Sequence, residues 1–238
     1  VIGEGFHRKY GEDHAERVAL KKARKRAKGS TLYINLEPCS PHPKKTPPCT
    51  EEIKKAGVAK VVVAMKDPNP NVNGRGLTRL RKAGIKTEVG LLKGEAEKIN
   101  AAFVKVQKKG LPYVISKWAM TLDGKIATSS GNSKWISNDT SREVVKNLRS
   151  KVQAIIIGSK TALEDNPMLS APKGKPKRVV LDSWARISLN SKLVKTARKQ
   201  PTILAVSTSA PREKLKKLKR SGCQLMHLEA MDLKVILE

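Results

Sequence analysis

The sequence predicts an α/β protein made of two domains in succession. Short apolar runs of strand length alternate with helical segments along most of the chain, which is typical of sheets covered by helices. Gly57 and Gly84 each stand just after an expected helix and just before an expected strand, where the end of a helix favours glycine. A polar break with glycine and proline at 108–112 interrupts the alternation, so we expect domains at 1–110 and 111–238.

In the expected first domain, strands and helices follow one another with short connections. Residues 1–6 have the pattern of the end of a strand, and Asp13 is a suitable N-cap for a helix with a stripe of small apolar side chains. The other strands are expected at 31–36, 58–65 and 86–92, and the other helices at 50–56, 77–83 and 95–108. This order predicts a sheet with helices on its faces.

The expected second domain has the same α/β character. The segment 113–127 has strand character, and 171–177 is a basic loop of low complexity. Further strands are expected at 154–158, 178–182, 202–207 and 224–228, and helices at 141–149 and 212–220. The sequence begins within one apolar run and stops within another, so we expect it to lack both ends of the full protein.

The chain carries a strongly positive charge. Its 49 Lys and Arg residues exceed its 21 Asp and Glu residues by 28, a balance that allows a nucleic-acid or membrane-surface partner. The basic residues are spread along the chain, however, and aromatic residues, which would stack on bases, make up only 3%. We therefore expect neither nucleic acid nor a membrane as the partner, and interpret the charge as solvated helix faces.

Length, hydrophobic content and cysteine content limit the class of protein further. With 238 residues, 39% of them hydrophobic, the chain is long enough for one or two cores, and no apolar run approaches the roughly 20 residues of a membrane helix. Three cysteines do not describe a disulfide framework, so we expect a cytoplasmic protein.

Three residues have the chemistry and the spacing of zinc ligands. His14 stands at the start of a helix, Cys39 follows the end of a strand, and Cys49 opens the next helix. One imidazole and two thiolates hold Zn²⁺ with its fourth coordination position open. Because open α/β sheets bind ligands at the carboxyl ends of their strands, we expect these element ends to meet there. The sequence therefore predicts one Zn²⁺ per chain.

Glu16 is the expected catalytic residue of this site. A carboxylate beside a zinc-activated water can take a proton and return it to a leaving group, which is the chemistry of hydrolytic deamination. A His-x-Glu motif followed by two Pro-Cys pairs is typical of zinc nucleobase deaminases. Simpler interpretations stay open at this point: Asp13 and Glu16 as a capping box, His14 as a surface imidazole, and Cys39 and Cys49 as core residues.

The motifs of both halves resemble one family in an ordered series. They are GEGFH at 3–7, HAE at 14–16, LEPCS at 36–40, TPPC at 46–49, DPNP at 67–70, GRG at 74–76, LDGK at 122–125, SGNSKWIS at 130–137, DNP at 165–167 and VLDS at 180–183. In this order, and over nearly the whole chain, the set resembles the bifunctional riboflavin-biosynthesis protein, a pyrimidine deaminase fused to a reductase. The resemblance implies a cytidine-deaminase-like three-layer N-terminal domain followed by a partial dihydrofolate-reductase-like α/β domain.

The resemblance also implies substrates, cofactors and residue roles. The first domain would deaminate a diaminopyrimidinone ribosylamino 5′-phosphate at the zinc site, with Glu16 as the proton donor. The second domain would use NADPH to reduce the ribosyl group to a ribityl chain, and the protein would be a homo-oligomer. The family's NADP contacts fall on Ala119, Trp135, Thr161, Asp165 and Ser183, and its reductase substrate contacts on Ser133, Arg149 and Leu169. Trp135 as a core aromatic and Arg149 as a solvated helix end remain alternatives.

Two other functions stay open at the level of sequence. A nucleoside or nucleic-acid deaminase would share the zinc motif, but such enzymes usually have only two residues between the cysteines. A basic binding protein with a vestigial zinc site would not need Glu16. The interval from Cys39 to Cys49 is one residue longer than the family's common spacing, so roles for His42 and Lys45 within it stay open.

Overall fold

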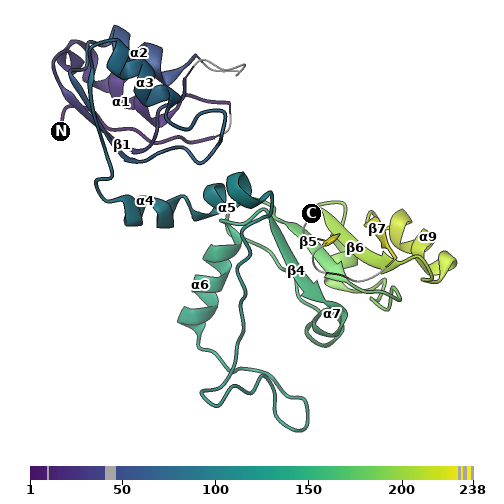
Figure 1. Cartoon of the computed structure of the whole chain (residues 1–238). Coiled ribbons are helices and arrows are strands. Elements are labelled where there is room, and N and C mark those ends of the chain that lie inside the picture. The colour runs from purple at the N-terminus through teal and green to yellow at the C-terminus, as the bar shows by residue number, and fades with distance from the viewer. Residues whose placement is uncertain (10, 41–46, 230–231, 233–234, 237–238) are drawn as a thin grey trace. The chain divides into compact units, whose positions relative to one another are not determined.

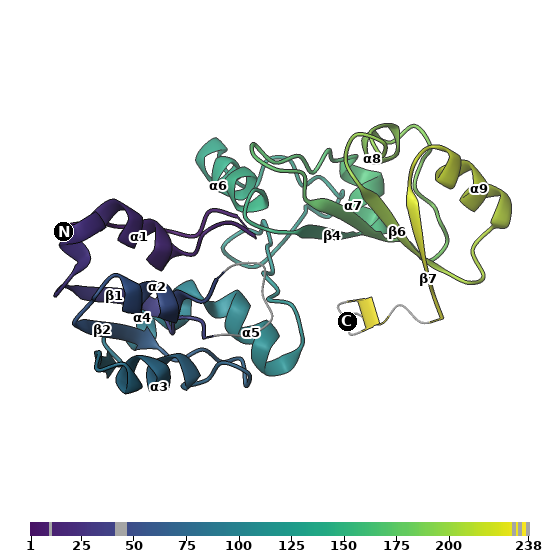
Figure 2. The ribbon, with the colours of Figure 1, turned by 90° about the horizontal axis from the view of Figure 1, so that it is seen from above.

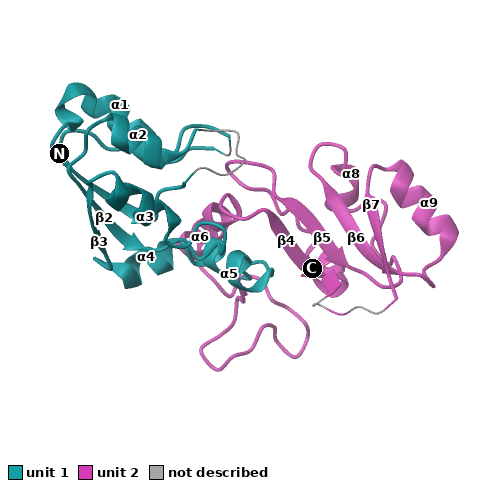
Figure 3. Ribbon diagram, turned by 45° about the horizontal axis from the view of Figure 1, so that its top comes forward, with its two compact units in different colours: residues 1–114 teal, residues 115–238 magenta. Residues whose placement is uncertain are grey.

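Two sheets of parallel strands organise the chain, one in residues 1–114 and one in residues 115–238 (Figures 1 and 3). This computed structural model describes residues 1–9, 11–40, 47–229, 232 and 235–236. Each of the two units encloses a hydrophobic core of its own. Within the described ranges, no helix has the length and the hydropathy needed to cross a membrane.

The sheet of the first unit has the strand order β1-β2-β3. Strand β1 spans Thr31–Leu36, β2 spans Lys60–Met65 and β3 spans Lys86–Val89. Both pairs are parallel. The middle strand β2 is buried from its second residue to its last, as expected where helices cover both faces of a parallel sheet. The first strand has the predicted bounds, whereas β2 and β3 are shorter than predicted.

Helices cover both faces of this sheet and give it three layers (Figure 1). Helix α1 spans Ala15–Ala23, α2 Cys49–Lys55, α3 Arg75–Lys82, α4 Lys93–Ile99 and α5 Ala101–Lys109. Since successive side chains of a strand point to opposite faces, Val63 packs with Leu80 of α3, whereas Ala64 packs with Ala96 of α4. The three-layer arrangement predicted for the N-terminal domain is confirmed.

Two predictions for the first unit are wrong. Residues 1–6 form no strand. They follow α1 so closely that a Cβ atom on Gly3 would lie 2.5 Å from the Ala19 carbonyl oxygen. The helix predicted at 95–108 is interrupted at Asn100, where α4 ends and α5 begins. The side-chain amide of Asn100 donates to the Ala96 carbonyl, so a local side-chain bond accompanies the break.

The sheet of the second unit has the order β4-β5-β6-β7, and all of its pairs are parallel. Its strands are β4 (Ala154–Gly158), β5 (Lys177–Leu181), β6 (Thr202–Ser207) and β7 (Gln224–Leu228), and its helices are α6 (Asp139–Arg149), α7 (Ser159–Asp165), α8 (Lys192–Lys195) and α9 (Arg212–Arg220). Val180, Leu193 and Leu218 join strands and helices in one core, and Figure 2 shows α9 beside β7. The predicted α/β character of this half is confirmed.

The segment that precedes α6 differs from its prediction. Residues 111–138 contain neither helix nor strand, so the strand character predicted at 113–127 is wrong (Figure 3). Large apolar side chains stay exposed there, among them Trp118 at 73% and Ile126 at 64% of their full surface. An apolar run becomes a strand only when a neighbouring strand accepts and donates its backbone hydrogen bonds, and the sequence pattern does not specify that neighbour.

Candidate metal centre

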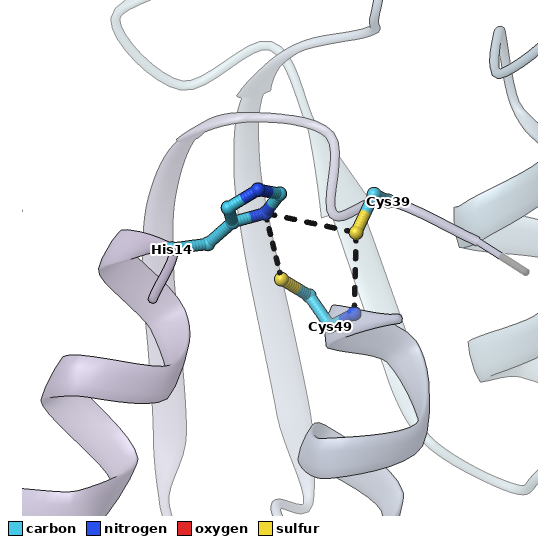
Figure 4. A group of neighbouring side chains, drawn as sticks. All are labelled: His14, Cys39 and Cys49. Carbon is cyan, nitrogen blue, oxygen red and sulfur yellow. Dashed lines mark hydrogen bonds between the residues drawn. The ribbon is translucent and has the colours of Figure 1, made fainter. Parts of the chain in front are cut away.

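Three element ends bring His14, Cys39 and Cys49 together. His14 is the N-cap of α1 and has an extended backbone, Cys39 comes three residues after the end of β1, and Cys49 is the first residue of α2. Both cysteines are buried, with exposed fractions of 6% for Cys39 and 0% for Cys49. Figure 4 shows the imidazole and the two sulfur atoms facing one another. His14 is half-buried, so its interpretation as a surface imidazole is wrong, whereas both cysteines are buried as the core interpretation also predicts.

The distances among these side chains fit one tetrahedral metal ion. The Nδ1 atom of His14 lies 3.2 Å from Cys49 Sγ and 3.7 Å from Cys39 Sγ, and all three donor atoms lie within 4.8 Å of one another. Ideal Zn–N and Zn–S bonds at a tetrahedral angle separate nitrogen and sulfur by about 3.6 Å. The donor set and its spacing therefore suit Zn²⁺ with one position left for another ligand.

The two thiols differ in acidity even without a cation. The hydrogen bond with the Cys49 thiol lowers the pKa of Cys39, and His14 and the Cys49 backbone N–H, 3.2 Å from the Cys39 sulfur, lower it further. The same thiol–thiol bond, together with burial, raises the pKa of Cys49. These contacts favour the thiolate form of Cys39, which is the form in which cysteine binds metal.

Glu16 lies in the first turn of α1, two residues after His14, and its side chain is buried. Burial raises the pKa of its carboxyl above the ordinary value. His14, Glu16 and Cys39 line a cavity of about 1160 Å³, together with Asp67 and Asn100. A carboxyl with a raised pKa, at the wall of a cavity and beside three metal donors, is suited to accept and release a proton.

Asp13 does not have its predicted role. The N-cap of α1 is His14, and no side chain caps this helix. The Asp13 carboxylate instead forms ion pairs with Arg17, at 3.2 Å, and with Lys21. The capping-box interpretation of Asp13 and Glu16 is therefore wrong, and the carboxyl of Glu16 is left for the cavity.

Sequence reasoning assigned no role to two residues beside the centre. The His7 ring lies edge-on to the His14 ring, with centroids 5.3 Å apart, and its Nδ1 atom is 3.1 Å from the Asp13 carbonyl oxygen. Glu37 is 3% exposed and accepts hydrogen bonds from four backbone N–H groups. His7 belongs to the motif GEGFH and Glu37 to the motif LEPCS, so membership in these motifs was the sequence signal that could have indicated a role.

The candidate residues of the reductase site are distributed over several parts of the second unit. Ala119, Ser133 and Trp135 belong to the segment without regular structure, whereas Arg149 ends α6, Thr161 and Asp165 belong to α7, Leu169 follows α7, and Ser183 follows β5. The Arg149 guanidinium donates to the carbonyl of Ser170, the residue after Leu169, at 3.3 Å. Trp135 is 73% exposed, so its interpretation as a core aromatic is wrong. The Arg142 guanidinium lies over the Trp135 ring in a cation–π contact, 4.4 Å from the ring centroid.

The loop between the two cysteines is described only in part. Residues 41–46, which include His42 and Lys45, lie outside the described residues. On either side of them, the Thr50 N–H donates to the Cys39 carbonyl at 3.2 Å. This bond closes the loop next to the metal donors, whatever path the residues between them follow.

Family models match both halves of the chain. Residues 1–65 match the cytidine and deoxycytidylate deaminase zinc-binding region, and residues 112–238 match the RibD C-terminal domain. The metal donors thus belong to a zinc-binding deaminase region, and the second sheet to a reductase-type domain. The class is that of bifunctional deaminase–reductase proteins.

Similar proteins identify the family. The riboflavin biosynthesis protein RibD of Aquifex aeolicus is 42% identical over the whole chain, which covers 67% of that protein, and RibD of Escherichia coli is 43% identical over 79% of the chain and 55% of its own length. A diaminohydroxyphosphoribosylaminopyrimidine deaminase/5-amino-6-(5-phosphoribosylamino)uracil reductase from Thermotoga maritima superposes with a TM-score of 0.84 at 36% identity, covering 100% of this chain and 66% of that one. RibD of Acinetobacter baumannii gives 0.83 at 37% identity, covering 99% and 66%. The chain belongs to the RibD family, and it spans about two thirds or less of the length of these relatives.

Proposed function

We propose that this chain carries two successive activities of riboflavin biosynthesis. Residues 1–110 hydrolytically deaminate 2,5-diamino-6-ribosylamino-4(3H)-pyrimidinone 5′-phosphate, and residues 111–238 contribute to the NADPH-dependent reduction of its ribosyl group to a ribityl chain. One observation carries the proposal: one nitrogen and two sulfur donors lie within 4.8 Å of one another beside a buried carboxyl at the wall of a cavity. Family membership supports the choice of substrate.

In the deaminase half, His14, Cys39 and Cys49 hold the metal and Glu16 moves the proton. When bound there, Zn²⁺ would supply Lewis acidity that makes water a better nucleophile. The Glu16 carboxylate would accept a proton from the attacking water and return it to the departing amino group, which leaves as ammonia. Its burial supports this role, because the pKa raised by burial brings its two protonation states closer in energy at neutral pH.

In the reductase half, two groups of side chains divide the binding of NADPH and substrate. Ala119, Trp135, Thr161, Asp165 and Ser183 contact the dinucleotide, and Ser133, Arg149 and Leu169 contact the pyrimidine substrate. The exposure of Trp135 supports the first role, because an uncovered ring can stack on a planar group. The guanidinium of Arg149 is a suitable partner for a phosphate.

The protein further acts as a homo-oligomer in the cytoplasm, with a small pyrimidine phosphate as its substrate. The free thiols of Cys39, Cys49 and Cys223 support a reducing compartment. Light scattering of the purified protein at several concentrations tests the oligomer, and a mass that stays at 26.1 kDa contradicts it.

An assay of ammonia release tests the deaminase. Zinc-loaded protein should release ammonia from the diaminopyrimidine phosphate, and Glu16→Gln should lower the rate by about 10³-fold or more while it keeps its zinc. Glu16→Asp is the matched control, because it keeps the acid but shortens its reach. Release of ammonia from single-stranded DNA or RNA alone would favour a nucleic-acid deaminase. Unchanged function in Glu16→Gln would favour a vestigial zinc site.

A further inference from the structure

Glu37 has the largest set of backbone partners of any acidic side chain in the described part of the first unit. It directly follows β1, and only 3% of its surface is exposed. One carboxylate oxygen accepts from the N–H groups of Asp67 at 3.2 Å and Gly74 at 2.8 Å. The other accepts from Gly76 at 3.0 Å and Leu77 at 3.4 Å. All four donors belong to the connection between β2 and α3 or to the first turn of α3.

The carboxylate replaces a helix cap that the sequence of α3 does not supply. Gly74 is the N-cap of α3 and has no side chain, so it cannot accept from the free N–H groups of the first turn. A capping side chain normally accepts from the second or third residue of the helix, which here are Gly76 and Leu77. Glu37 does this from the position directly after β1, and its negative charge is favoured at a helix N-terminus.

The same contact places α3 directly against the strand end that leads to Cys39. A Cβ atom on Gly76 would lie 2.2 Å from the Pro38 carbonyl oxygen, so only glycine allows this approach. The backbone N–H of Glu37 also donates to the Met65 carbonyl at 3.0 Å, which ties the ends of β1 and β2 together. Residues 37–39 are thus held on one side by β2 and on the other by α3.

This arrangement connects Glu37 to the cavity of the metal centre. Cys39 is two residues further along the chain, and Asp67, whose N–H Glu37 binds, lines the cavity with His14 and Glu16. A shift of the connection 67–77 would therefore move one metal donor and one cavity side chain together.

We propose that Glu37 is a positioning residue of the metal centre: its buried carboxylate fixes the connection 67–77 against the strand end 36–38, and so sets the positions of Cys39 and Asp67. Glu37 is not one of the three metal donors, and although it also lines the cavity, both of its carboxylate oxygens accept from backbone N–H groups. The effect on catalysis rests on the proposed deaminase function, whereas the effect on the protein backbone and on the metal geometry does not.

Glu37→Gln is the sharpest change, because it keeps the shape of the side chain and alters one acceptor atom. Glutamine has one carbonyl oxygen, so its NH₂ group would face two backbone N–H donors. Such an unsatisfied buried contact displaces one side of the connection. We expect amide hydrogen exchange of 67–77 to become at least tenfold faster, and the thiolate absorption band of the cobalt-substituted protein to shift. In the deaminase assay, kcat/KM should fall at least tenfold with metal still bound.

Two further variants keep the test decisive. Glu37→Asp retains both acceptor oxygens and the charge on a shorter side chain, so it should recover part of the lost kcat/KM and of the exchange protection. If Glu37→Gln does not fold, Glu37→Asp is compared with wild type by the same three measurements. Asp182→Asn is the matched control: Asp182 is also fully buried after a strand and accepts from the Ile187 N–H at 2.8 Å, but it lies in the second unit. It should leave the cobalt band and deamination unchanged.

The outcomes separate this proposal from the proposed function. Unchanged hydrogen exchange and an unchanged cobalt band in Glu37→Gln overturn the positioning role, even if the protein melts at a lower temperature. A lower melting temperature with wild-type kcat and KM in the folded protein overturns it as well, because a purely structural residue would behave in that way. If wild type releases no ammonia, the deaminase assignment fails, while hydrogen exchange and the cobalt band still decide the role of Glu37.

Discussion

The two units of the chain are built alike but differ in how closely they gather their candidate residues. Both have parallel sheets covered by helices. In the first unit, the three metal donors lie within 4.8 Å of one another, each at the end of a helix or strand. In the second unit, the candidates for NADPH and substrate are distributed over a segment without regular structure, two helices and two loops. A metal site needs few side chains of specific chemistry, whereas a cofactor site needs many side chains of ordinary chemistry.

The second unit also buries a charged side chain within a polar cluster. Arg178 is fully buried, and its guanidinium donates to the carbonyls of Met168, Leu193 and Gln200 and to the hydroxyls of Thr196 and Thr202. None of these residues belongs to the predicted reductase site. The cluster lies next to one predicted residue, because the Gln200 side chain donates to the Leu169 carbonyl at 3.5 Å. Burial and hydrogen bonding of a charged group therefore do not by themselves separate function from structural support, and experiments must distinguish them.

The largest expected effect is the loss of metal from the first unit. Cys49→Ala removes one of three protein donors, so we expect less than about a tenth of the wild-type zinc content and no measurable deamination. Cys223→Ala removes another buried cysteine and should keep one zinc per chain. Metal analysis after dialysis measures both variants. Equal zinc loss in both would mean that the cysteines act through folding and not through ligation.

Zinc should also stabilise the first unit against unfolding, without a direct effect on the second unit. A ligand that binds only the folded state adds about 4 kcal/mol when its free concentration is a thousandfold above its Kd. A chelator should therefore lower the melting temperature of the wild type but not that of Cys49→Ala. The same melting temperature for wild type with and without chelator would contradict metal binding at these residues.

The second largest effect concerns the buried guanidinium of the second unit. Arg178→Met leaves five acceptors without their donor, so we expect the free energy of unfolding to fall by about 3 kcal/mol or more. Arg186→Met is the control, because that side chain is 58% exposed, and it should cost about 1 kcal/mol or less. Denaturant unfolding measures the loss, and zinc content should stay the same in both variants. A loss of zinc in Arg178→Met would show that the two units depend on each other.

Some parts of the two units could be predicted from the sequence and others could not. Strands with a clear apolar pattern, such as β1, β6 and β7, have their predicted bounds, because local pattern and burial agree. The strands expected at 1–6 and 113–127 have apolar patterns too, but a strand also needs a hydrogen-bonded neighbour, which no local pattern specifies. The zinc donors were predicted because few residue types bind zinc. Glu37 was not given a role, because its four donors lie thirty to forty positions away.

A smaller effect is expected at high pH in the second unit. Burial raises the pKa of the Cys223 thiol from 9.0 to about 11, while the nearby Arg178 lowers it in part. Since the folded-state pKa lies above the unfolded one, the stabilising contribution of the neutral thiol is complete below pH 9 and is lost as the pH rises toward 11. Between pH 8 and 10.5 the wild type should therefore lose up to about 2 kcal/mol more than Cys223→Ala. Parallel curves for the two proteins in denaturant unfolding at both pH values would contradict the raised pKa.

The smallest expected effect tests the assignment of Trp135 to NADPH binding. Trp135 and Trp118 lie in the same segment and are equally exposed, at 73%, but only Trp135 is assigned to the dinucleotide. Stacking on an exposed ring contributes about 1.4 kcal/mol, so Trp135→Ala should weaken NADPH binding about tenfold. Trp118→Ala should leave it within twofold, and neither variant should change zinc content. Calorimetric titration with NADPH measures both. Equal weakening by the two variants would mean that the segment as a whole is required, and the residue-by-residue assignment of the cofactor contacts would then fail.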